Sequence, residues 1–181
     1  MNPLQPEIEI GKHPSGRGYR LQTNLILPRP QADAFAFFGD AFQLEMITPP
    51  WLYFHVTTPP PIEMTEGTLI NYRLKMHGIP IRWRTRISVW EPPHRFVDDQ
   101  LERPYQWWHH EHRFEAVEEG TKIYDQVNYG VPGGWPIHGL FVRHQLQRIF
   151  SYRYSMLLQL PIAQGKDSHL NLDRAAKDSS A

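Results

Sequence analysis

The middle of the chain alternates between apolar and polar residues with a period of two. The alternation is clearest over Thr68–His77 and Ile81–Trp90. This period is that of β-strands with one buried face. Further strands are expected at Leu52–Val56, Arg95–Leu101, Tyr105–Val117 and Thr121–Val131, with a hairpin at Glu119-Gly120 joining the last two. Sequential strands of this kind must bury one face of their sheet against another element.

One long amphipathic segment is available to cover that face. From about Ile137 to Leu160 a helical stripe is apolar, and only Arg153 interrupts it. A strand at Tyr19–Leu27 and two short helices within residues 30–47 come earlier in the chain. The order predicts an α+β fold in which a strongly curved antiparallel sheet of about seven strands wraps around a long C-terminal helix.

Length and composition favour one domain with two short flanks. A chain of 181 residues suits a single core. Residues 1–18 are rich in glycine and proline and predict an N-terminal arm with a short strand at Glu7–Ile10. Residues 19–160 form the predicted domain, and residues 161–181 a polar C-terminal tail.

Several classes of function are disfavoured by composition. The chain has no cysteine, which excludes thiolate metal sites and cysteine nucleophiles. Its formal net charge is zero, so nucleic acid is not an expected partner. The N-terminus is too polar for a signal peptide, and the apolar run Ala34–Phe38 is too short to span a membrane. A cytoplasmic protein with no cofactor and no metal ion is predicted, and its oligomeric state stays open.

Three segments resemble a known superfamily. They are ADAFAFFGDAFQLEMITPPWL at 32–52, PYQWWHHEHRFEAVEEGTKIYDQVNYGVP at 104–132 and FVRHQLQRIFSYR at 141–153. Together with the intervening strands they resemble the START/Bet v 1-like (SRPBCC, helix-grip) superfamily, in its bacterial cyclase/dehydrase-like, ligand-binding branch. The resemblance implies a deep cavity between the sheet and the C-terminal helix. It does not imply one activity, because the superfamily includes lipid carriers, hormone receptors, cyclases and interaction modules.

Two histidines are expected to point into this cavity. On a strand, His110 and His112 share a face with Trp108 and Phe114, and Phe114 is a good core residue. Asp125, on the next strand, is expected on the same wall. This set is compatible with a metal site in which Asp125 is the third ligand. It is also compatible with acid–base catalysis in which a histidine is the base and Asp125 orients it.

A structural polar network is the third interpretation, and the one we favour for the cluster. Buried charges are usually paired rather than reactive. Arg153 needs an acceptor in the interior, and Asp125 or Asp98 could supply it.

Aromatic residues at alternating positions are the candidate cavity lining. The predicted ligand-binding residues are Phe38, Phe54, Tyr72, Trp83, Phe96, Trp108, Phe114, Tyr129, Phe150 and Arg153. They favour binding of a small hydrophobic ligand, whether aromatic, polyketide-like, isoprenoid or lipid-like. The alternatives are a cyclase or dehydratase that uses His110, His112 and Asp125, and a regulatory module with a closed cavity. The sequence leaves open whether the protein is an enzyme.

Overall fold

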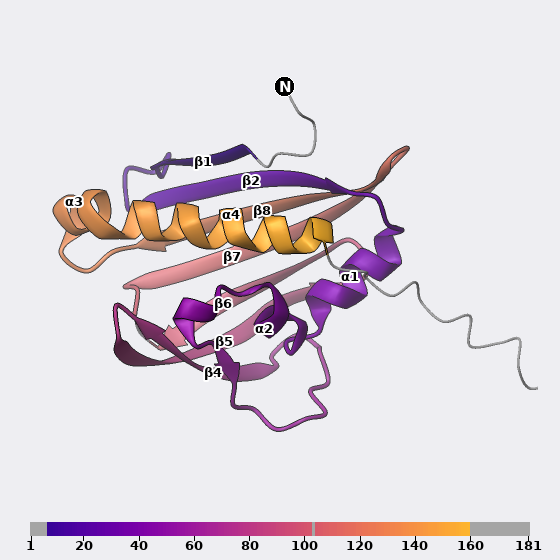
Figure 1. The fold of residues 1–181 in the computed structure, drawn as a ribbon, viewed down its shortest axis with the longest axis horizontal. Coiled ribbons are helices and arrows are strands. Elements are labelled where there is room, and N and C mark those ends of the chain that lie inside the picture. Colours follow the sequence, from indigo (N-terminus) through magenta and orange to yellow (C-terminus); the bar gives the residue numbers. More distant parts are fainter. Residues whose placement is uncertain (1–6, 103, 160–181) are drawn as a thin grey trace, which may run out of the picture.

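The computed structural model describes residues 7–102 and 104–159, which form an eight-stranded antiparallel sheet curved around a C-terminal helix (Figure 1). The strands are β1 Glu7–Lys12, β2 Tyr19–Leu27, β3 His55–Val56, β4 Leu69–Met76, β5 Ile79–Glu91, β6 Arg95–Glu102, β7 Trp107–Val117 and β8 Gly120–Gly130. Their order in the sheet is β1-β2-β8-β7-β6-β5-β4-β3. The α+β class and the antiparallel sheet are as predicted.

The sheet has one strand more than the sequence predicted. Glu7–Lys12 pairs along its whole length with β2, so this part of the predicted arm is an edge strand. Residues 1–6 of the arm and 161–181 of the tail lie outside the described residues. The predicted strand Leu52–Val56 is reduced to His55–Val56. Its first residue belongs instead to a short 3₁₀ turn, η1 Pro50–Leu52, because the prolines before it favour a turn.

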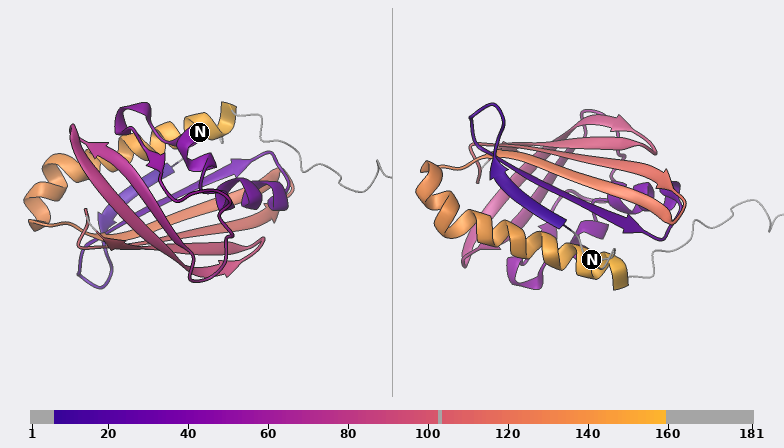
Figure 2. Two further views of the ribbon diagram at one scale, coloured as in Figure 1. Left: turned by 90° about the horizontal axis from the view of Figure 1, so that it is seen from below. Right: turned by 90° about the horizontal axis from the view of Figure 1, so that it is seen from above.

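Helices cover the concave face of the sheet. The first group is α1 Gln31–Gly39, α2 Gln43–Ile47 and η1 Pro50–Leu52, and the second is α3 Gly134–Ile137, η2 His138–Val142 and α4 Arg143–Gln159. The views in Figure 2 show α4 lying across the concave side of the sheet. The predicted helix Ile137–Leu160 therefore starts earlier than expected and contains a π-helical turn, η2. Its last residue, Leu160, lies outside the described residues.

The pairing of β5 with β6 has two register shifts, and the second changes which residues of β5 face the core. The first, between Arg84 and Thr85, skips Leu101 of β6, and the second, between Ile87 and Val89, skips Ser88 of β5. An extra residue in one strand reverses the alternation beyond it. Trp90, rather than Val89, therefore packs against aromatic rings of the core, with its ring centroid 5.0 Å from that of Phe35.

Two groups of buried side chains form the core. The larger joins α1, α4, β2, β7 and β8 and includes Leu21, Val127 and Phe150. The smaller lies under β4 and β5 and includes Ile70 and Ile87. Members of both groups line a single cavity between the sheet and α4. No helix among the described residues is long and apolar enough to cross a membrane.

Candidate functional site

The cavity is lined mainly by apolar side chains from strands β4 to β7, the α1–η1 region and α4. Its volume is about 130 Å³. Sites for drug-sized ligands measure roughly 300–1,000 Å³. An engineered apolar cavity of about 150 Å³ binds benzene. The space therefore suits a molecule of about one ring rather than a long lipid or an extended polyketide.

Most of the predicted ligand-binding residues line this cavity. They are Phe38, Phe54, Tyr72, Trp83, Phe96, Trp108, Phe150 and Arg153. Phe114 and Tyr129 do not line it, although both are buried. Phe114 packs edge-on against Phe35, and Tyr129 lies beyond the cavity, against Tyr19 and His138.

Sequence reasoning concentrated on aromatic rings and left out an aliphatic part of the wall. Ile70, Leu74 and Met76 line the cavity and share a face of β4 with Tyr72, so their alternation could have identified them. Met64 also lines the cavity from the irregular segment before β4, and Leu52 does so from the short turn η1. No periodicity marks residues of that kind.

One end of the cavity is polar. Asp98 of β6 and His110 of β7 are opposite each other in the sheet, and His112 follows two residues along β7. Asp98 Oδ2 lies 3.4 Å from His110 Nδ1 and 3.6 Å from His112 Nε2. The two imidazole centroids are 3.8 Å apart, and Phe96 stacks on His112 at 4.3 Å. Both histidines and Asp98 line the cavity.

Asp125 lies behind the two histidines and is not part of the cavity lining. Its Oδ1 is 2.5 Å from His112 Nδ1 and 3.5 Å from His110 Nε2. The Tyr154 hydroxyl donates a hydrogen bond of 2.8 Å to the other carboxylate oxygen, Oδ2. The structure thus brings the three predicted catalytic residues together, with Asp98 as a fourth member on the cavity side.

Burial and mutual charge determine the protonation of this cluster. Burial lowers the pKa of His110, and the neighbouring His112 lowers it further. Burial also acts to lower the pKa of His112, but Asp125 and Asp98 outweigh it and raise that pKa. For Asp125, burial is outweighed by the two histidines, and its pKa lies well below the ordinary value. These pKa shifts favour a charged His112, which lies between two ionised carboxylates, and they favour a neutral His110.

Trp83 Nε1 and Arg153 Nε, at the cavity wall, have no hydrogen-bond partner among the described residues. Neither Asp98 nor Asp125 forms an ion pair with Arg153, whose guanidinium lies over the Phe150 ring at 5.1 Å. Arg153 still contributes, with the two histidines, to holding the pKa of Asp98 below its usual value against the opposing effect of burial.

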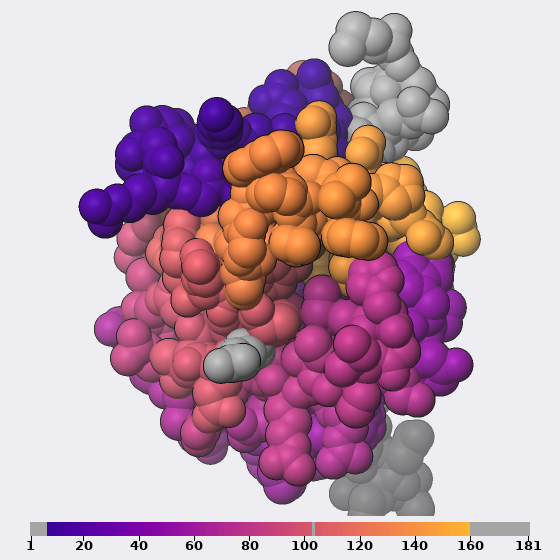
Figure 3. Space-filling model, turned by 90° about the vertical axis from the view of Figure 1, so that its left-hand side faces the viewer, coloured from indigo at the N-terminus to yellow at the C-terminus, as the bar shows by residue number. Residues whose placement is uncertain are grey.

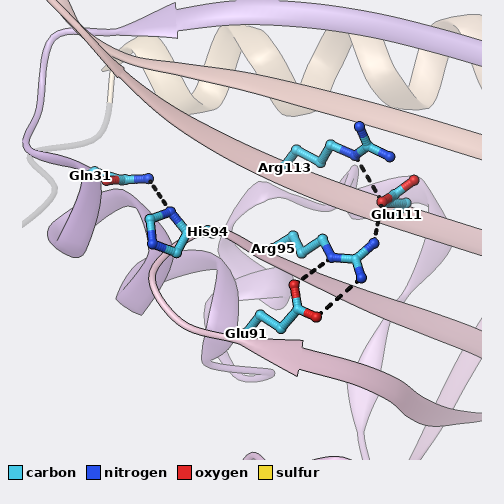
Figure 4. Close-up of polar contacts among 6 residues, drawn as sticks. All are labelled: Gln31, Glu91, His94, Arg95, Glu111 and Arg113. Carbon is cyan, nitrogen blue, oxygen red and sulfur yellow. Dashed lines mark hydrogen bonds and ion pairs between the residues drawn. The ribbon is translucent and has the colours of Figure 1, made fainter.

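The outer face of the same strands carries a separate ion-pair network (Figure 4). Arg95 pairs with Glu91 at 2.6 Å and with Glu111 at 3.2 Å, and Arg113 donates to Glu111 at 2.8 Å. This network links β5, β6 and β7 on the side away from the cavity.

One end of the molecule exposes several apolar side chains, and Figure 3 views it directly. Trp135 and Leu140, in the α3–η2 segment, are 79% and 71% exposed. The turn between β4 and β5 approaches this segment, with the His77 ring 6.3 Å from that of Phe141. Gly133 precedes α3 with φ 81°, a conformation that favours glycine.

Comparisons with known proteins identify the fold. No protein-family model and no curated protein matches the chain. Among solved structures, a protein from Rhodobacter sphaeroides is similar with a TM-score of 0.61 and 21% identity, over 84% of this chain and 96% of that one. Ara h 8.0201 is similar with a TM-score of 0.54 and 15% identity, over 84% of this chain and 100% of that one.

A third similar structure is the di-domain ARO/CYC StfQ from the steffimycin biosynthetic pathway. The TM-score is 0.59 at 14% identity, over 77% of this chain and 49% of that one. These neighbours confirm that the chain has the START/Bet v 1-like, helix-grip fold that its segments resemble. At such identities the likeness concerns the fold alone.

Proposed function

We propose that the protein binds a small, mostly apolar molecule of about one ring in the cavity between the sheet and α4. The observation that carries this proposal is an apolar wall with a single polar end. Ligand sites typically combine apolar walls with a few convergent polar groups that orient the ligand. Here Asp98 would accept a hydrogen bond from the polar group of the ligand, and Trp83 Nε1 or Arg153 Nε would donate one.

The ligand chemistry follows from this pairing of groups. A ring that carries a hydroxyl group matches the apolar wall, the acceptor at its polar end and the donors on the wall. Carrier or sensor functions need only such binding. The similarity to Ara h 8.0201 and to an ARO/CYC supports a fold suited to internal ligands but does not identify one.

A thermal-shift comparison of three probes tests the proposal. Phenol offers a ring and a hydroxyl group, toluene the ring alone, and decanoate a long chain. A ligand that binds only the folded state raises the melting temperature. The largest rise is expected with phenol, a smaller one with toluene, and the smallest with decanoate. No rise with any ring probe would contradict the proposal and favour a regulatory module with a closed cavity.

A second candidate function is proton-transfer catalysis of the cyclase or dehydratase type. It is favoured by the position of His110, which lies at the cavity surface beside Asp98 and has Asp125 behind it. A base in this position could remove a proton α to a carbonyl group of a bound ligand.

Deuterium exchange at the α-carbons of cyclohexanone, followed by NMR in D₂O, tests this second function. The wild type and His109→Gln should accelerate the exchange, because His109 lies on the outer face and pairs with Asp99 at 2.7 Å. His110→Gln should not. Exchange at the same rate in all three proteins, or at the rate without protein, would rule out His110 as a base.

A further inference from the structure

We propose that Asp98, His110 and His112 form a binding site for one divalent transition-metal ion of the zinc type, open toward the cavity. Each residue offers one ligand atom, and these atoms lie within 4.8 Å of one another. The inference goes beyond ligand binding and does not depend on it.

The spacing of the ligand atoms fits one ion. Asp98 Oδ2 is 3.4 Å from His110 Nδ1 and 3.6 Å from His112 Nε2. Ligand atoms about 2.0–2.1 Å from a tetrahedral zinc ion lie about 3.3 Å from one another. An ion placed between these three atoms therefore needs only small side-chain movements. Two imidazoles and a carboxylate are a ligand set suited to zinc and its neighbours in the first transition row.

The far side of each imidazole supports the same conclusion. One ring nitrogen of each histidine faces Asp98, and the other is within 3.5 Å of Asp125 Oδ1. Histidines that bind metals generally place their second nitrogen against a carboxylate or carbonyl group, which fixes the tautomer and the ring orientation. Asp125 is itself fixed by the Tyr154 hydroxyl. The sequence suggested Asp125 as the third ligand, whereas the geometry makes it the support and Asp98 the ligand.

The position in the fold leaves room for a ligand on the ion. All three residues line the cavity, and the Asp98 side chain is 19% exposed. Zinc sites with three protein ligands and an open position are those at which zinc polarises a bound oxygen or water. In this cavity the open position would receive an oxygen of the bound molecule.

Strands β6 and β7 also carry a pair of residues that serves as a matched control for the proposed metal site. On the outer face, one residue along each strand, His109 and Asp99 form a pair with a distance of 2.7 Å and no second histidine among the described residues nearby. This pair resembles the inner site in residue type and strand position. It lacks the third ligand and the cavity.

The test uses the full-length chain without a purification tag, freed of metal by dialysis against a chelator and titrated with Co²⁺. Four-coordinate Co²⁺ has much stronger visible absorption than hydrated Co²⁺, and Zn²⁺ displaces it without colour. The wild type should bind one Co²⁺ per chain with strong bands that Zn²⁺ removes. Asp98→Asn and His112→Gln should lose these bands, and Asp99→Asn and His109→Gln should keep them.

Two results would overturn the proposal. One is a wild type without strong bands, and the other is a set of bands that survives Asp98→Asn. Circular dichroism checks that each variant is folded. If the inner variants do not fold, X-ray absorption of the zinc-loaded wild type decides the question. Two imidazole nitrogens and a carboxylate oxygen are expected around the ion, and any other imidazole number would refute the site.

Discussion

At the scale of single residues, the account depends on Asp125 and the groups that keep it ionised in the interior. This carboxylate is 1% exposed. An ionised group at such a position needs charged or hydrogen-bonding partners, because burial alone would favour the neutral form. Two imidazoles and one hydroxyl provide them. The arrangement makes the Tyr154 hydroxyl a direct contributor to stability.

Tyr154→Phe tests that contribution. The change removes a hydrogen bond to a charged group, so the free energy of unfolding should fall by about 1.5–3 kcal/mol. Tyr152→Phe on the same helix is the control, since Tyr152 is only partly buried and its ring lies against Trp51 rather than Asp125. Urea denaturation measures both changes. Equal losses in the two variants would show that the bond to Asp125 contributes nothing specific.

The sequence located much of the polar cluster but not its arrangement. Alternation along β7 and β8 was enough to place His110, His112 and Asp125 on one wall. The position of Asp98 opposite His110 depends on the pairing of β6 with β7. That pairing joins two separate strands, and the alternation within each strand does not encode its register.

At the scale of elements, the α3–η2 segment is held to the sheet by His138. The His138 ring stacks on Tyr19 with centroids 3.4 Å apart, and its Nε2 lies 3.0 Å from the Tyr129 hydroxyl. Burial lowers the pKa of His138, and the charge of Arg143 lowers it further. The folded protein therefore favours the neutral ring.

This shift predicts a loss of stability in acid. Because the folded pKa of His138 lies below the unfolded value of about 6.5, its contribution is complete above that pH. It is lost as the pH falls through the lowered folded pKa. Between pH 7 and pH 5 the wild type should lose more unfolding free energy than His138→Phe, which cannot titrate there. Urea denaturation at several pH values measures both losses, and an equal loss of unfolding free energy in the two proteins would contradict the prediction.

Boundaries of the long strands were predicted to within two residues, because each strand alternates along its length. The strand Tyr19–Leu27 was predicted with the bounds that the structure gives. The edge strand was missed in part, because Glu7–Lys12 has few large apolar residues and depends on pairing with β2. The π-helical turn at His138–Val142 also has no sequence signal that differs from that of an ordinary helix.

At the scale of the whole molecule, curvature produces the cavity. Because the curved sheet wraps around one helix, a space remains between the two groups of core residues, and aromatic rings line it. The family resemblance predicted such a cavity, but no pattern in the sequence could give its size. That size depends on how deeply residues outside the sheet, such as Met64 and Leu52, enter the interior. The size of the cavity restricts the proposed ligand more strongly than the chemistry of its lining does.

The most direct test of the ligand-binding account is a calorimetric titration of phenol into a cavity-filling variant. Ile70 is 1% exposed and lines the cavity, so Ile70→Phe places a ring in the space that the ligand would occupy. Ile79→Phe makes the same change at a site 65% exposed on the neighbouring strand. The account predicts that Ile70→Phe weakens phenol binding by about tenfold or more, or about 1.4 kcal/mol, while Ile79→Phe binds like the wild type. Equal affinities in the two folded variants would contradict it.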